Sequence, residues 1–394
     1  MVQTDGTGCN AVLENLCFCL TEPGDAVLVP TPYYAAFDFD LGARIGLTLI
    51  PVVSKSLDAT TLNMNYGSTR KNQSTEESNN KCKSTFICPS QYYPTRQSLD
   101  SAYNDALSLG HPPKVLLLSH PNNPLGICYP PSVVKECIEW VRERHIHLIS
   151  DEIYAGSVYR QSSSSYVDKD STQNNGSFQS ILQLAATHES SISKKTGFGL
   201  GPYIHFVYAL SKDFALSGLR VGVAYSENEN IRLPMQKLND LCQVSSQTQC
   251  TVEHMLNAKS LIPQLNHECD TTHATKVSWS TDLFLEEGRK RIRERCDRLQ
   301  QCLLENEIPY IPADSGMFVW MDLSEFLPKL TAMDFDKMER QLYLELLENG
   351  LLFTPGRSMR NEFPGFFRCV FTAATDQGFD LALERIAKFV QSRR

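Results

Sequence analysis

Four short apolar runs that do not alternate with polar residues place the strongest constraint on how this 394-residue chain can fold. Runs of this kind are typical of β-strands buried on both faces, as in a parallel sheet covered by helices. The four runs are Ala26–Val29, Val115–Leu118, His145–Ile149 and Ile204–Leu210. Helical patterns at 11–20 and 133–144 precede the first run and join the second to the third. Because strand–helix–strand order produces right-handed crossovers, the sequence predicts an α/β fold of three layers around a mostly parallel sheet.

The pattern changes after about residue 225, where longer helices and fewer strands are expected. The expected elements are helices at Ile231–Asn257 and Phe284–Glu307, a strand at Met317–Asp322, a helix at Asp336–Glu348, strands at Leu351–Phe353 and Phe366–Phe371, and a closing helix at Phe379–Gln391. This order is typical of a smaller α+β domain. We therefore expect a large domain over residues 1–270 and a small C-terminal domain over residues 271–394.

Two segments that are poor in apolar residues interrupt the expected large domain, near residues 54–97 and 161–180. Both are rich in Ser, Asn and Thr, and the second contains the run Ser162–Ser165. Ordering such segments costs more conformational entropy than their burial returns. We expect both to be mobile insertions on the surface.

Composition excludes several classes of function. Lys and Arg number 37 against 45 Asp and Glu, and no basic block is present, so a nucleic-acid partner, which requires clustered positive charge, is not expected. No apolar stretch approaches the roughly 18 residues of a membrane span. The 13 cysteines include no Cys-x-x-Cys pair, so no metal site is expected. Their odd number and the lack of a signal-peptide pattern favour a reduced, cytoplasmic protein.

Each of the four apolar runs is followed by side chains that commonly bind ligands. The residues are Tyr34 after the first run, Asn123 after the second, Asp151 and Tyr154 after the third, and Lys212 after the fourth. In open parallel sheets, ligands bind in the crevice outside the carboxyl ends of the strands. We therefore expect these side chains to converge on one site.

A glycine-containing turn, Gly6-Thr7-Gly8-Cys9-Asn10, opens a helix ahead of the first run. The first N–H groups of a helix and the helix dipole both favour an anion, so the turn is suited to a phosphate group. The turn on its own is a weak signal.

Taken together, these motifs resemble the fold-type-I, pyridoxal-phosphate-dependent class I/II aminotransferases, and most closely their 1-aminocyclopropane-1-carboxylate (ACC) synthase and synthase-like branch. The motifs are Val29-Pro30-Thr31-Pro32-Tyr33-Tyr34, Asn122-Asn123-Pro124-Leu125-Gly126, Ser150-Asp151-Glu152-Ile153-Tyr154, Leu210-Ser211-Lys212-Asp213-Phe214, Ser217-Gly218-Leu219-Arg220-Val221-Gly222, Thr354-Pro355-Gly356 and Pro364-Gly365-Phe366-Phe367-Arg368-Cys369-Val370-Phe371. They occur in this order over nearly the whole chain, apart from the two insertions. The resemblance implies a large domain with a mostly parallel sheet, a smaller α+β C-terminal domain, and pyridoxal 5'-phosphate as cofactor.

The resemblance also implies roles for five residues around the cofactor ring. Lys212 would form a Schiff base with the cofactor aldehyde and, once freed by substrate, move the Cα proton. Asp151 would pair with the pyridinium nitrogen and keep it protonated. Tyr154 and Asn123 would donate to the phenolic oxygen of the ring, and Asn123 would also belong to the substrate-binding site. Tyr34 would stack on the ring.

Five further residues are assigned by the resemblance to the cofactor phosphate and the substrate. Arg220 and the backbone of Cys9 and Asn10 would hold the phosphate, and Ser211 would lie in the same cofactor site. Arg368 would bind the substrate α-carboxylate through a two-pronged hydrogen bond, which a lysine could not reproduce. Arg368 also lies within an apolar strand pattern, where an unpaired charge is costly, and this favours a functional role that faces inward.

The chain departs from the family pattern in three places. Ala209 stands where a hydroxyl residue is usual, so one hydrogen bond to the phosphate is expected to be missing. Cys9 and Asn10 stand where plant synthases carry small residues, which indicates the synthase-like relatives. Family members have a substantial segment ahead of the phosphate turn, whereas here the turn begins at Gly6. We expect that segment, which gates the substrate and supplies a tyrosine to the partner subunit, to be absent, and dimerisation and cofactor retention to be weakened.

The function expected from the resemblance is a reaction at the Cα of an amino acid, with an aminotransferase that uses an amino acid and a keto acid as the first choice. The alternatives are synthase-type γ-elimination from S-adenosylmethionine and a C–S lyase reaction. A protein of another class, a non-catalytic or truncated binding module of the same fold, is a further alternative. Family members are homodimers, so the resemblance also implies a homodimer.

Overall fold

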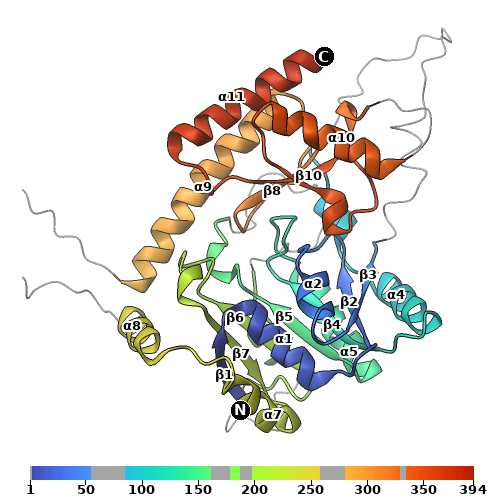
Figure 1. The fold of residues 1–394 in the computed structure, drawn as a ribbon, viewed down its shortest axis with the longest axis vertical. Helices are drawn as coiled ribbons and strands as arrows, with labels where there is room; N and C mark the ends of the chain where they lie inside the picture. Colours follow the sequence, from blue (N-terminus) through green and yellow to red (C-terminus); the bar gives the residue numbers. More distant parts are fainter. Residues whose placement is uncertain (1, 55–84, 161–177, 187–197, 258–279, 329–333) are drawn as a thin grey trace, which may run out of the picture.

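The structure is a computed structural model that describes residues 2–54, 85–160, 178–186, 198–257, 280–328 and 334–394 (Figure 1). Its larger sheet has seven strands in the order β1-β7-β6-β5-β4-β2-β3. The bounds are β1 Val2–Thr7, β2 Ala26–Pro30, β3 Thr48–Val52, β4 Pro113–Ser119, β5 His147–Asp151, β6 Ile204–Ala209 and β7 Val221–Ser226. Strands β2 to β6 pair in parallel, and β7 is antiparallel to both of its neighbours. The expected α/β fold with a mostly parallel sheet is confirmed.

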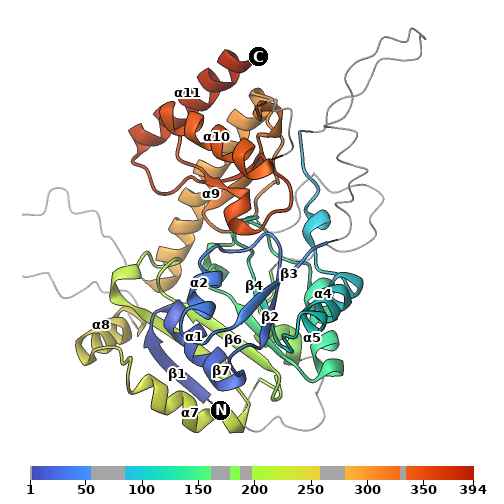
Figure 2. The ribbon, with the colours of Figure 1, turned by 45° about the vertical axis from the view of Figure 1, so that its right-hand side comes forward.

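Helices cover both faces of this sheet (Figure 2). One layer contains α1 (Cys9–Leu20), α2 (Phe37–Gly42) and α7 (Glu229–Asn239), and the other contains α4 (Arg96–Ser108), α5 (Pro131–Arg144) and α6 (Ile181–Ala186). Side chains of β4 alternate between the layers: Val115 and Leu117 pack under α1, whereas Leu116 and Leu118 pack under α4 and α5. All four are buried, which explains why the apolar run does not alternate with polar residues.

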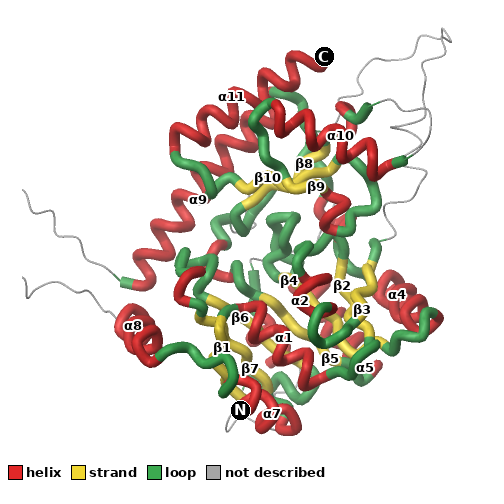
Figure 3. Tube along the Cα trace, in the orientation of Figure 1, coloured by secondary structure: helices red, strands yellow, loops and turns green. Residues whose placement is uncertain are grey.

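A second sheet of three antiparallel strands lies beyond the carboxyl ends of the parallel strands (Figure 3). It contains β8 (Phe318–Asp322), β10 (Phe366–Val370) and β9 (Thr354–Pro355) in that order. Three helices pack on it, α9 (Thr281–Glu305), α10 (Phe335–Glu348) and α11 (Asp376–Arg393), and they share a separate apolar core with it. The boundary that we placed at residues 270 and 271 lies outside the described residues and stays a proposal.

The expected helix at Ile231–Asn257 is wrong, because the structure has two helices there, α7 and α8 (Ser246–Asn257). Ser245 caps the start of the second helix, since its hydroxyl accepts a hydrogen bond from the backbone N–H of Thr248 at 3.1 Å. A serine at this position satisfies an N–H group that the helix itself leaves without a partner.

The expected strand at Leu351–Phe353 is also wrong. Leu351 and Phe353 are buried, but strand pairing begins only with β9 at Thr354. The apolar pattern there reflects burial against the helices rather than membership of a sheet.

The described end of the first polar segment differs from a surface insertion. Residues 85–97 contain a short 3-10 helix, Pro89–Tyr92, and the start of α4. Tyr92 is only 2% exposed, and Phe86 forms a β-bridge with Tyr310. Most of the two predicted insertions, residues 55–84 and 161–177, lies outside the described residues. Within the described residues, no helix has the length and apolar character needed to cross a membrane.

Candidate active site

Asp151 lies at the carboxyl end of β5 and is almost fully buried. Its Oδ1 atom accepts hydrogen bonds from the Ile153 backbone N–H at 3.2 Å and from the Cys9 thiol at 3.5 Å. Burial raises the pKa of Asp151 to about 6, and the nearby Lys212 ammonium acts in the opposite direction. A buried carboxylate with so few partners is suited to receive a positively charged group.

Lys212 lies in the turn after β6, which begins at Leu210. The charges of Arg368 and Asp151 both act on its side chain. Partial burial lowers the pKa of Lys212, and the positive charge of Arg368 lowers it further, while Cys9 and Asp151 raise it. A lowered pKa increases the fraction of neutral amine, which is the form that acts as a nucleophile or a base.

Asp213 fixes the lysine turn, a contribution that the sequence analysis missed although the residue stands in the quoted motif. Its carboxylate accepts hydrogen bonds from the Gly156 N–H at 2.6 Å, the Ser157 hydroxyl at 2.5 Å and the Tyr208 hydroxyl at 2.9 Å. These donors join the turn after β6 to the turn that follows Tyr154. Two sequence-predicted site residues are therefore held together through Asp213.

Arg368 extends from β10 toward the end of the parallel sheet. Its Nη1 donates to Asn123 Oδ1 at 2.7 Å, and its Nη2 donates to Thr354 Oγ1 at 3.1 Å. Its Nε is buried and has no hydrogen-bond partner within the described residues. The guanidinium carbon lies 5.6 Å from the ring centroid of Phe318, and burial lowers the pKa of Arg368. No carboxylate neutralises this arginine in the described structure, so the site has a positive charge available for an anionic ligand.

Tyr34 and Tyr154 border the same space. Tyr154 is 5% exposed and packs edge-on against Phe318, with ring centroids 5.3 Å apart. Tyr34 is half-buried and packs edge-on against Phe37 at 5.4 Å. Burial raises the pKa of both hydroxyls, so both are neutral donors at neutral pH, and both feel the charge of Arg368.

An anion-binding turn lies at the N-terminus of α1. Gly8 has a φ of 93° and no side chain caps the helix, so the first N–H groups point outward. The guanidinium of Arg220 lies directly over this turn, because a Cβ added at Gly8 would come within 2.2 Å of Arg220 Nη2. A Cβ added at Gly222 would come within 2.5 Å of the Gly8 carbonyl carbon, so β7 approaches the turn as closely as only glycine allows.

The remaining residues that the sequence analysis named near the phosphate are Asn10, Ser211 and Ala209. The side chain of Asn10 donates to Asp40 at 2.8 Å, so only its backbone faces the turn. Ser211 is half-buried in the lysine turn. Ala209 is fully buried opposite Gly222 and offers no hydroxyl. Two residues of the three-stranded sheet that contact Arg368, Phe318 and Thr354, were given no role in the sequence analysis. Thr354 stands in the quoted motif Thr354-Pro355-Gly356, whereas no motif indicated Phe318.

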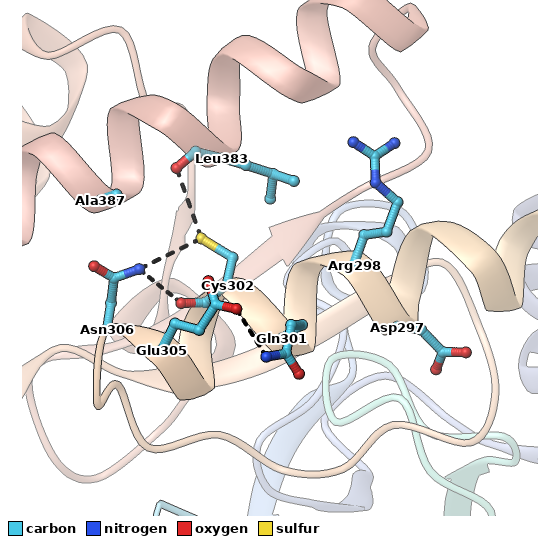
Figure 4. Close-up of a pocket in the computed structure, with 8 residues that line it drawn as sticks. All are labelled: Asp297, Arg298, Gln301, Cys302, Glu305, Asn306, Leu383 and Ala387. Carbon is cyan, nitrogen blue, oxygen red and sulfur yellow. Dashed lines mark hydrogen bonds between the residues drawn. The ribbon is translucent and has the colours of Figure 1, made fainter.

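A separate, open pocket of about 590 Å³ lies on the surface between α9 and α11, away from this site (Figure 4). It is lined by Asp297, Arg298, Gln301, Cys302, Glu305, Asn306, Leu383 and Ala387. Within the described residues, no group of three or more His, Cys, Asp and Glu side chains is arranged to hold a metal ion.

Comparison with known proteins decides the family. Residues 4–386 match the model of the aminotransferase class I and II family. The chain belongs to this family. Class I/II aminotransferases and their ACC synthase relatives depend on pyridoxal phosphate.

Curated relatives of this class I/II protein include ACC synthase 11 of Arabidopsis thaliana, which is 31% identical over 393 residues, covering 100% of the chain and 68% of the relative. ACC synthase 1 of Oryza sativa subsp. indica is 29% identical over 98% of the chain and 64% of its own length. ACC synthase 2 of Cucurbita pepo is 32% identical over 98% of the chain and 63% of its own length. The chain therefore spans about two thirds of the length of these relatives.

Solved structures support the same fold. Aspartate aminotransferase from Thermus thermophilus with maleate superposes with a TM-score of 0.67 at 20% identity, covering 98% of this chain and 75% of the other. An aminotransferase from Staphylococcus aureus gives a TM-score of 0.64 at 19% identity, covering 100% of this chain and 78% of the other.

The residues of the site fit pyridoxal phosphate. The cradle of Gly8 and Arg220, which a Cβ would fill, suits the phosphate group. The buried carboxylate of Asp151 suits a protonated ring nitrogen. Lys212 lies close enough to that carboxylate for its negative charge to raise the lysine pKa. The unpartnered Nε of Arg368 leaves a donor for a further anion.

Proposed function

We propose that this member of the class I/II aminotransferase family moves the amino group of an α-amino acid to a keto acid, with pyridoxal phosphate as its cofactor. One observation carries the proposal: the side chain of Lys212 lies close enough to both Arg368 and Asp151 for their charges to shift its pKa, Arg368 downward and Asp151 upward. A lysine with a lowered pKa, a buried carboxylate and an arginine without an acid partner are the three groups that this chemistry needs.

Bound pyridoxal phosphate supplies an electron sink for negative charge at the substrate Cα. The chain's own residues would hold it at three points. Arg220 and the N–H groups at the start of α1 would bind the phosphate. Asp151 would pair with the ring nitrogen and keep it protonated, Tyr154 and Asn123 would donate to the ring oxygen, and Tyr34 would stack on the ring.

Arg368 orients the substrate. Its guanidinium carries hydrogen bonds to Asn123 and Thr354, which fix its plane. The N–H of Nε, together with a second N–H of a neighbouring Nη, would donate to an incoming α-carboxylate. A two-pronged hydrogen bond defines both the position and the rotation of a carboxylate. The Cα of the bound substrate is thereby directed toward Lys212.

Lys212 would transfer the proton. Its Nζ accepts the proton from the substrate Cα and later releases it, and the lowered pKa makes the neutral amine available for this step. Asp213 holds the turn in place, so that the amine keeps its direction through both transfers.

A second candidate function is the synthase reaction, in which S-adenosylmethionine loses its γ-substituent and the amino acid closes to a cyclopropane. Identity of 29–32% to ACC synthases over 98–100% of the chain favours it. A C–S lyase reaction would share the same first proton transfer. The synthase and lyase reactions would use Lys212, Asp151 and Arg368 in the same roles as the aminotransferase reaction. The reaction products therefore distinguish the three.

We further propose a cytoplasmic homodimer, in keeping with the general assembly of the family. Sedimentation of the full chain with and without pyridoxal phosphate tests the dimer. A monomer in both conditions would overturn it.

The test of the function begins with the full chain and pyridoxal phosphate. We expect an absorption band above 400 nm, and borohydride reduction followed by peptide mapping should place the label on Lys212. Lys212→Ala should lose the band and the label, whereas Lys388→Ala, an exposed lysine on α11, should keep both.

An amino-acid screen then separates the reactions. Keto acid release that requires a second keto acid supports the aminotransferase, and release of methylthioadenosine from S-adenosylmethionine supports the synthase. A folded protein in which Lys212 takes no label overturns both and supports the non-catalytic alternative.

A further inference from the structure

The connection from β9 to β10 is held at both ends by one buried carboxylate. Glu339, on α10, is 1% exposed. Its Oε1 accepts the backbone N–H of Arg357 at 2.9 Å, and its Oε2 accepts the backbone N–H of Gly365 at 2.8 Å. One side chain therefore closes a loop of about ten residues, and each of its oxygens has a partner.

The loop that Glu339 closes is tightly packed. A Cβ added at Gly365, which has a φ of 93°, would lie 2.6 Å from the Cα of Ser324. A Cβ added at Gly356 would lie 2.7 Å from the Phe366 carbonyl oxygen. Because both ends lack room to shift, the two N–H groups are presented to Glu339 in a fixed geometry.

The two anchored N–H groups lie at equal distances along the chain from a cross-strand pair that contains Arg368. Arg357 lies three residues after Thr354, and Gly365 lies three residues before Arg368. Thr354 and Arg368 are opposite each other in the β9–β10 pair, and their side chains form the 3.1 Å hydrogen bond described above. The position of Arg368 relative to Thr354 thus depends on how the loop is closed.

The same loop also reaches the segment that carries Tyr34. The carbonyl oxygen of Met359 accepts the backbone N–H of Tyr33 at 3.0 Å, and Arg360 forms an ion pair with Asp38 at 3.1 Å. The loop therefore connects the strand of Arg368 to the turn after β2. How the loop is closed therefore affects both sides of the site, the side of Arg368 and the side of Tyr34.

We propose that Glu339 is a positioning residue that fixes Arg368 for the substrate α-carboxylate. It does not touch the substrate; it acts through the backbone of β9 and β10. A buried carboxylate is costly unless hydrogen bonds compensate it, and here both compensating donors belong to the loop of the substrate arginine. The proposal rests on the proposed function, because it presumes that Arg368 binds a carboxylate.

The first part of the test needs no cofactor. Amide hydrogen exchange of peptides from residues 354–370 is compared in the full chain, in Glu339→Gln and Glu339→Ala, and in Glu348→Gln, an exposed glutamate on the same helix. We expect faster exchange in both Glu339 variants, larger for alanine, and no change in Glu348→Gln. Unchanged exchange in Glu339→Ala would overturn the proposal.

The second part separates positioning from general destabilisation. Cofactor-loaded protein is titrated with L-alanine and with ethylamine, which differ only by the carboxylate. Misplacement of Arg368 by a fraction of an ångström should weaken apparent binding of L-alanine about tenfold in Glu339→Gln and leave ethylamine unchanged. Equal effects on both probes, or none on L-alanine, would assign Glu339 a structural role only and overturn the proposal.

The two parts also separate this proposal from the proposed function. If Lys212 of the unaltered chain takes no pyridoxal label, the proposed function fails and Glu339 loses its role in substrate binding. In that case, faster amide hydrogen exchange in the Glu339 variants would show only that Glu339 stabilises the loop. If the label is present and the variants respond as stated, both stand.

Discussion

Nη1 of Arg368 lies 2.7 Å from Oδ1 of Asn123, although 245 positions separate the two residues in the sequence. The bond joins the three-stranded sheet to the turn after β4, at the edge where the parallel strands end. It also fixes the orientation of the Asn123 amide, since only the oxygen can accept from a guanidinium. The amide nitrogen is then directed to the other side, where a ring oxygen could accept from it.

Arg368→Lys should abolish most amino-acid binding while leaving the cofactor in place. A lysine ammonium is a point donor and cannot hold Asn123, Thr354 and a carboxylate in one plane. We expect the apparent dissociation constant for an amino-acid substrate to rise about 100-fold. Absorbance titration of the loaded protein measures this, and Arg340→Lys, at an exposed site on α10, is the control. Unchanged affinity in Arg368→Lys would remove the arginine from the site.

Asp151→Asn should stabilise the protein without cofactor at neutral pH. Burial raises the pKa of Asp151 to about 6, so the folded state holds this proton more tightly than the unfolded state, whose pKa is near 3.8. The tighter proton binding therefore adds up to about 3 kcal/mol to the free energy of unfolding below pH 4. This contribution is lost as the pH rises through 6. The variant lacks this loss, so its advantage in unfolding free energy should grow from pH 4 to pH 7.

The same substitution should weaken retention of pyridoxal phosphate, because a neutral amide lacks the negative charge that favours a protonated ring nitrogen. Gel filtration of loaded protein at pH 7.5 measures the loss. A variant that gains no stability at pH 7, or that keeps the cofactor as well as the parent does, contradicts the role given to Asp151.

Much of the large sheet could be predicted because its central strands are buried on both faces. The apolar runs of β2, β4 and β6 are visible without any alignment, and the motifs at their ends follow the general rule for parallel sheets. The edge strands carry weaker signals. In β3, Pro51 interrupts the pattern, and β1 contains one apolar residue among six. Edge strands tolerate both, because one side needs no sheet partner.

The contacts around Arg368 could not be predicted in the same way. Its position in a motif indicated a functional arginine, but Phe318 and Thr354 meet it only through the pairing of β8, β10 and β9. Glu339 lies on a helix whose apolar pattern predicts only which face packs against the sheet. Such contacts depend on strand register and loop closure, and neither is specified by local sequence pattern.

Asp213→Ala should be severe and Asp213→Asn mild. Gly156 N–H and the Tyr208 hydroxyl both donate to Oδ2, so an asparagine can place its oxygen there and its NH₂ toward the Ser157 hydroxyl, which can turn to accept. Alanine leaves three donors without an acceptor, at a cost of about 3 kcal/mol or more. Urea unfolding midpoints of the two variants measure the difference. Equal losses would refute this hydrogen-bond scheme.

Two adjacent imidazoles, one half-buried and one fully buried, should make the protein sensitive to acid. His147 Nδ1 lies 3.1 Å from His205 Nε2, and His205 Nδ1 lies 2.8 Å from the Ser226 hydroxyl. Burial lowers the pKa of His147 to about 4 and holds the pKa of His205 well below the ordinary value of a histidine. Both are neutral in the folded state, so their contribution is present above pH 6.5, the ordinary pKa of an unfolded histidine, and is lost as the pH falls toward 4.

His147→Gln tests this sensitivity, because glutamine removes the titrating group and keeps a polar side chain. The parent should lose about 3 kcal/mol of unfolding free energy through His147 between pH 7 and pH 4, and the variant should not. As the pH falls, the free energy of unfolding of the variant should therefore rise relative to that of the parent. His254→Gln, at an exposed site on α8, should run parallel to the parent. Urea unfolding at several pH values gives the three curves, and a constant gap between parent and His147→Gln would show that the imidazole is not held neutral by burial.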